Sequence, residues 1–166
     1  MDHIYASAIR IAEKVVPDEV DLAPAIIDSA LAGGRQWKDL LQPVQGSELG
    51  GVFGGIEGGD LVAVINAIQE STSILANLLS MSSAVLSVIV SFLVIRERNE
   101  LDQKLETLNE GDADKLKIAI SSTSQHLVEL GIKVERADEM SRLTIQALLE
   151  DPQNSKKFLV ELSKKQ

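Results

Sequence analysis

The stretch ILANLLSMSSAVLSVIVSFLVI, residues 74–95, decides the fold of this chain. It lies inside a longer run, residues 71–95, that contains no Asp, Glu, Lys or Arg. No Pro or Gly interrupts the run, and Arg96 and Arg98 close it. As one helix, residues 74–95 would be roughly 33 Å long, which is close to the hydrocarbon thickness of a bilayer. The stretch therefore predicts a long apolar helix that is a candidate transmembrane span.

The two faces of this predicted helix differ in side-chain size rather than in charge. The wide face carries Leu, Ile, Val, Met and Phe, whereas small residues recur on the other face at steps of three and four. In membranes, small residues let helices approach closely, and serines can hydrogen-bond across the contact. We therefore predict self-association through a small-residue stripe that includes Ala76, Ser80, Ala84, Ser87 and Ser91.

A second interpretation places the same helix at the centre of a helical protein. A helix that is apolar around most of its circumference is also typical of a buried core element. The amphipathic segments 1–32 and 112–165 would then pack onto residues 74–95 and cover them. We place the membrane interpretation first, because so long an uncharged run exceeds what a small core usually contains. The many serines keep the core interpretation open, since they make the segment less hydrophobic than a simple anchor.

The segment GGVFGGIEGG, residues 50–59, precedes the apolar stretch. On a helix its glycine pairs, four residues apart, would form a second bare stripe for self-association. The alternative is a flexible linker with Asp60 capping a helix that starts at Leu61, because Gly costs a helix about 1 kcal/mol relative to Ala. A phosphate-binding loop is excluded by the absence of a nearby Lys. The stripe comprises Gly50, Gly51, Gly54, Gly55, Gly58 and Gly59.

The rest of the chain shows amphipathic helical patterns and no strand pattern. Pro17 ends the first of these patterns, a second runs from Pro24 to Gly33, and Asp112 or Asp114 can cap the first helix of the C-terminal part. The predicted fold is thus all-α. Its expected parts are amphipathic helices over 1–45, a Gly-rich segment over 46–60, a long apolar helix that continues as a charged helix over 61–110, and a small helical bundle over 112–166.

Composition excludes several classes of function. The chain has 25 Asp and Glu against 16 Lys and Arg, and this net charge of −9 argues against nucleic acid as a partner. It has no Cys, so disulfides, zinc–thiolate sites and a cysteine nucleophile are excluded. His3 and His126 have no partner at metal-ligand spacing, and no serine lies in a nucleophile motif. We predict no enzyme activity and no catalytic, cofactor-binding or metal site.

Three residues bear on orientation in a membrane. The basic residues lie mostly after the apolar stretch, which predicts a cytoplasmic C-terminal part with Arg96 and Arg98 at the membrane interface. Trp37 lies in RQWKDLL between basic residues, as interfacial anchors do. The alternative for Trp37 is a core position beneath the N-terminal helices.

These patterns predict a small membrane protein that self-associates into a pore or membrane-perturbing assembly, in the manner of holins, toxins and cell-death effectors. Its expected partners are further copies of itself, membrane lipid, and a protein bound by the C-terminal helices. The alternative is a soluble cytoplasmic adaptor or structural subunit, whose apolar helix is buried in a bundle or in the core of an oligomer.

Overall fold

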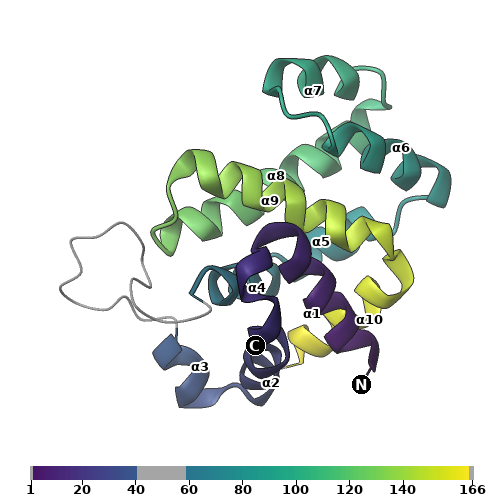
Figure 1. The fold of residues 1–166 in the computed structure, drawn as a ribbon. Helices are drawn as coiled ribbons and strands as arrows, with labels where there is room; N and C mark the ends of the chain where they lie inside the picture. The colour runs from purple at the N-terminus through teal and green to yellow at the C-terminus, as the bar shows by residue number, and fades with distance from the viewer. Residues whose placement is uncertain (1, 41–58, 165–166) are drawn as a thin grey trace.

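The structure is a computed structural model that describes residues 2–40 and 59–164, and its regular elements are all helical (Figure 1). The all-α fold predicted from the sequence is confirmed. The N-terminal elements are α1 (Asp2–Val15), the 3-10 helix η1 (Pro17–Leu22), α2 (Ala23–Ala32) and α3 (Gly34–Leu40). Gly33, at φ 64°, ends α2, because this left-handed conformation favours glycine.

Residues 61–110, which include the uncharged run 71–95, do not form the single helix expected there. Four shorter helices take its place: α4 (Gly59–Glu70), α5 (Thr72–Leu79), α6 (Ser83–Leu93) and α7 (Arg98–Leu105). Among the described residues, no single helix is both long and apolar enough to cross a bilayer. The pair α4 and α5 meets the length and composition of a span only when taken together, and it is bent by 74°.

Hydroxyl groups form hydrogen bonds to the backbone at each break in a run that has no Gly or Pro. At the α4–α5 bend, the Thr72 hydroxyl donates to the carbonyl oxygens of Ile68 and Gln69, at 3.1 and 2.7 Å. After α5, the Ser80 hydroxyl donates to its own helix, and Ser82 then caps α6 by accepting the Val85 N–H at 3.4 Å. Such side chains compete for backbone groups and so end helices.

The C-terminal elements are α8 (Glu110–Glu129), α9 (Val134–Glu150) and α10 (Pro152–Ser163). The expectation that Asp112 or Asp114 caps α8 is wrong, because Asn109 does so by accepting the Gly111 N–H at 2.9 Å. This helix begins earlier than the sequence pattern suggests, and both aspartates therefore lie inside it.

The core forms around α4, which packs against α2, α5, α8, α9 and α10. Leu61, Val64 and Ile68 are completely buried there. The two ends of the sequence meet in the same core, since α1 packs against α9 and α10. Figure 1 shows α6 and α7 together at one end of the molecule, with α2 and α3 at the other.

Candidate interaction site

The small-residue stripe lies on the outward sides of α5 and α6. All five of its predicted members are exposed: Ala76, Ala84, Ser87 and Ser91 within these helices, and Ser80 directly after α5. Of the glycine stripe, Gly59 is buried at the start of α4. The remaining predicted positions lie outside the described residues: Gly50, Gly51, Gly54, Gly55 and Gly58.

Part of the wide apolar face of α6 points inward, onto α9. Leu86, Ile89 and Leu93 are buried at 0–5% exposure. On the outer side, the Ser87 and Ser91 hydroxyls donate to carbonyl oxygens of their own helix, at 2.9 and 2.6 Å. The two serine hydroxyls on the exposed side of α6 thus already donate within their own helix. This side of α6 also carries no charged side chain.

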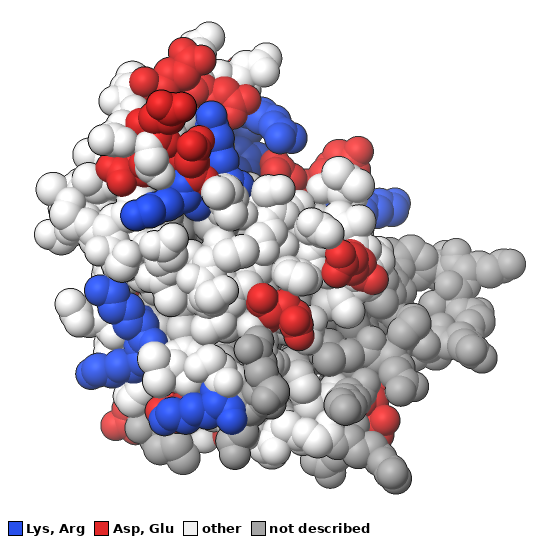
Figure 2. Space-filling view, turned by 180° about the vertical axis from the view of Figure 1, so that it is seen from behind, with Lys and Arg blue, Asp and Glu red and all other residues white. Residues whose placement is uncertain are grey.

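The exposed sides of α5 and α6, which we call the uncharged face, include Val88 at 42% exposure. No Asp, Glu, Lys or Arg occurs in either helix. Figure 2 shows one side of the molecule, on which charged side chains gather at the top and a broad band below them is largely free of charge. Because charged residues are depleted at the cores of protein interfaces, the uncharged face is the strongest candidate for an interaction surface.

The three residues predicted to lie at a membrane interface, Trp37, Arg96 and Arg98, differ in their burial. Trp37 is only 6% exposed and belongs to the hydrophobic core, which agrees with the core alternative for this side chain. Arg96 and Arg98 are exposed where α6 passes into α7.

A polar cluster fixes the first turn of α4 to two other elements. The Glu19 carboxylate of η1 accepts a hydrogen bond from the Leu61 N–H at 2.8 Å, and Asp60 forms an ion pair with Arg136 of α9. Burial raises the pKa of Glu19, and the negative charge of Asp60 adds to this effect. Asp60 was expected to cap α4, but Glu19 supplies this cap. No local sequence pattern could reveal this, since Glu19 lies 42 residues before Leu61.

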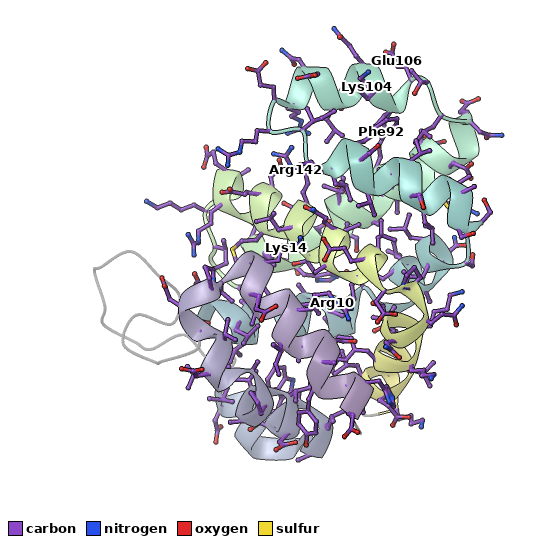
Figure 3. The ribbon with its side chains drawn as sticks, turned by 45° about the vertical axis from the view of Figure 1, so that its right-hand side comes forward. Arg10, Lys14, Phe92, Lys104, Glu106 and Arg142 are labelled. Atoms are coloured by element: carbon purple, nitrogen blue, oxygen red, sulfur yellow. The ribbon has the colours of Figure 1, made fainter. Side chains whose placement is uncertain are left out.

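Two hollows open on either side of Arg142, a residue of α9 that the sequence patterns did not single out. One, of about 490 Å³, lies between α7, α8 and α9. The other, of about 540 Å³, lies between α9 and the end of α6 with the linker that follows. Figure 3 shows Arg142 where α9 meets the α6–α7 end of the molecule. Its side chain donates to the Ile95 carbonyl oxygen and contacts Asp138, both at 3.4 Å.

The histidines lie on different helices, with His3 in α1 and His126 in α8. His126 Nδ1 is 3.3 Å from the Glu129 carboxylate of the same helix. In the part of the chain that the structure describes, no group of three or more His, Cys, Asp or Glu residues is arranged to hold a metal ion.

Comparison with known proteins gives no family for this chain. No protein-family model, no curated protein and no solved structure matches it. Its function is therefore inferred from its own residues and their contacts.

Proposed function

We propose that this chain is a non-enzymatic helical interaction domain, in which α4 and the inward sides of α5 and α6 are the protein's own core. The observation that carries the proposal is the burial of α4, where every residue from Leu61 to Ile65 is at most 1% exposed. Full burial of one large aliphatic side chain is worth about 1.5–3 kcal/mol. Helix α4 is thus held strongly by the helices around it.

The uncharged face is the surface through which we propose that the domain binds a partner, including a further copy of itself. It leaves Val88 exposed on a helix without charged residues. A partner docking there would not have to strip water from an ionised side chain of α5 or α6, which is the costly part of burying a polar surface.

A second candidate function is membrane perturbation after the domain opens. It is favoured by α4 and α5, which together have the length and composition of a membrane span. To insert, this pair would have to leave α2, α8 and α10, and the hydrogen bond from Leu61 to Glu19 would break. The two functions therefore differ in whether the helices around α4 must separate.

A disulfide lock distinguishes the two functions. The Ser71 and Ser122 hydroxyl oxygens are 3.1 Å apart, joining the α4–α5 bend to α8, and the chain has no native Cys. The double variant Ser71→Cys/Ser122→Cys would therefore form a single cross-link at a site with suitable side-chain proximity. Oxidised and reduced samples are compared for retention in carbonate-washed membranes, for dye release from phosphatidylglycerol vesicles, and for oligomer size.

For an interaction domain, we expect no dye release, extraction by carbonate, and the same oligomer size in both redox states. Dye release by the reduced double variant, lost on oxidation, would instead establish the second function. The single variants Ser71→Cys and Ser122→Cys, kept reduced to prevent cross-links between chains, are the matched controls, because neither can close the lock within one chain. Release that is equal in oxidised and reduced samples would show that opening between α4 and α8 is not required.

A further inference from the structure

We propose that the hollow between α7, α8 and α9 binds a single-chain amphiphile with an anionic head group, either phosphate or carboxylate. This inference goes beyond the proposed interaction function and does not depend on it. The hollow has a volume of about 490 Å³, within the range of pockets that hold small molecules. Its walls combine basic side chains from all three helices with aliphatic side chains, which is the pairing that such a ligand requires.

The basic side chains come from one residue of each helix: Arg98 of α7, Lys117 of α8 and Arg142 of α9. Two acidic residues, Asp102 and Asp138, also line the hollow, so its walls carry an excess of positive charge in a chain with a net charge of −9. Neither Arg98 nor Lys117 forms an ion pair with another described residue, whereas Arg142 contacts Asp138. Two cations are thus available to an anionic head group.

Arg142 itself is incompletely hydrogen-bonded. Its contacts with the Ile95 carbonyl oxygen and with Asp138 are both 3.4 Å long, beyond the 2.7–3.2 Å typical of N–H···O bonds. Its Nε–H is buried and has no hydrogen-bond partner among the described residues. Because the Nε–H is closed to solvent, an added anion would bind the terminal nitrogens, whose present contacts are long. Such a bond would be favourable, because bonds between ionised partners are roughly twice as strong as neutral ones.

The aliphatic part of the hollow faces α7 and α8. Leu101 and Leu105 are the two residues that α7 buries, and both line the hollow together with Ile120 of α8. Val134, at 63% exposure, is an uncovered apolar side chain on its wall. Helix α7 packs mainly against α6 and forms one wall of the hollow. An alkyl chain in the hollow can contact the side of α7 that faces α8 and α9.

The test is calorimetric titration of the full chain with dodecyl phosphate and with dodecanoate, each below the concentration at which it forms micelles. We expect both to bind with one site per chain and to slow amide hydrogen exchange in residues 98–105. Inorganic phosphate tests the head group alone and is expected to bind at least tenfold more weakly. Dodecyltrimethylammonium tests the alkyl chain with a cationic head, and equal binding of this probe would overturn the proposal.

Variants place the ligand in this hollow. Lys117→Gln removes an exposed cation and is expected to weaken dodecyl phosphate binding roughly two- to fivefold, the upper part of the range for one exposed ion pair. Lys115→Gln, on the same helix but outside the hollow, is the matched control and should bind as the wild type does. Dodecyl phosphate binding by Arg142→Gln is measured as well, once circular dichroism has shown that this variant keeps the helix content of the wild type. Unchanged affinity in both Lys117→Gln and a folded Arg142→Gln, or no binding of either anionic probe, would refute the site.

Discussion

The carboxylate of Glu19 accepts a hydrogen bond of 2.8 Å from the backbone N–H of Leu61, so η1 caps the buried helix α4. The first N–H groups of a helix have no partner within it, and here one of them is paired by a side chain from a distant element. Glu19 is half-buried, with Asp60 and Arg136 as its charged neighbours. The start of the core helix is therefore determined by tertiary contacts.

Removing this cap is expected to destabilise the fold. In Glu19→Ala, the Leu61 N–H loses its partner, which costs about 1–2 kcal/mol, as for other lost helix caps. Denaturant unfolding followed by circular dichroism measures the change. Glu13→Ala is the matched control, since the side chain of this exposed α1 residue forms no ion pair or hydrogen bond with another described residue. The stability of this variant should stay within about 0.5 kcal/mol of the wild type.

The pH dependence of the same residue has a defined sign. Burial raises the pKa of Glu19 above its usual value near 4.5, so the folded protein holds this proton more tightly than the unfolded chain. The stability gained from protonation is complete below about pH 4.5 and is lost as the pH rises through the raised pKa. Glu19→Gln, which cannot ionise, should gain stability relative to the wild type from pH 4 to 7, and a constant difference would contradict this.

Asp151 lies between α9 and α10 and links both helices to α1. Its carboxylate accepts the Asn154 N–H at 3.2 Å at the start of α10 and pairs with Arg10 of α1 at 3.1 Å. Burial raises the pKa of Asp151, but the hydrogen bonds from Asn154 and the charge of Arg10 outweigh it, so that the pKa is lowered. Its contribution is therefore present above the unfolded value near 3.8 and is lost as the pH falls through the lowered pKa.

We expect Asp151→Ala to lower the free energy of unfolding by about 2 kcal/mol at pH 7, because it removes a helix cap and leaves Arg10 without its acidic partner. The deficit should shrink as the pH is lowered below 4. Asp114→Ala, at an exposed position of α8, serves as the control in the same urea titrations. A deficit that is the same at pH 7 and pH 3 would show that the charge of Asp151 is not involved.

The burial of α4 can be tested with one substitution at two sites. Ile65→Ala, at 1% exposure in α4, is expected to cost about 2–5 kcal/mol because it leaves a cavity. Ile118→Ala, at 54% exposure in α8, should change stability by less than about 0.5 kcal/mol. Thermal and denaturant unfolding measure both, and similar losses at the two sites would contradict the proposed packing.

The orientation of α6 gives opposite expectations for two adjacent residues. Ser87 is exposed, so Ser87→Leu should keep the fold, and light scattering should show a changed oligomer size only if the uncharged face mediates self-association. Leu86 is 4% exposed, so Leu86→Ser should cost about 2–4 kcal/mol through lost apolar burial and an added buried hydroxyl. If Ser87→Leu proves the more destabilising of the two, the described orientation of α6 is wrong.

Local patterns were sufficient to predict α1, although not every helix end elsewhere in the chain. The apolar residues Ile4, Ala8, Ile11 and Val15, spaced at helical intervals, are all buried in α1. Pro17 marks the end of that pattern, although the segment after it forms η1, which the patterns did not predict. The break before α6 was not predicted, although Ser82, which lies outside the predicted stripe, caps this helix. The preference of Ser for the cap position is the sequence feature that could have indicated the break.

By itself the sequence determined that this protein is all-α, because helical periodicity, turn residues and the lack of strand patterns are local properties that each segment carries alone. It also determined that residues 71–95 carry no charged side chain, which favours burial of at least one face of the helices that they form. Only the tertiary structure decided what those faces pack against: α4 and α5 bend at Ser71 and lie against α8 and α10, and α6 turns part of its wide face to α9. The cap from Glu19 is not local, since it lies 42 residues before Leu61. The bend has a local part, the hydrogen bonds of Thr72, and a distant part, the contact of Ser71 with Ser122 of α8.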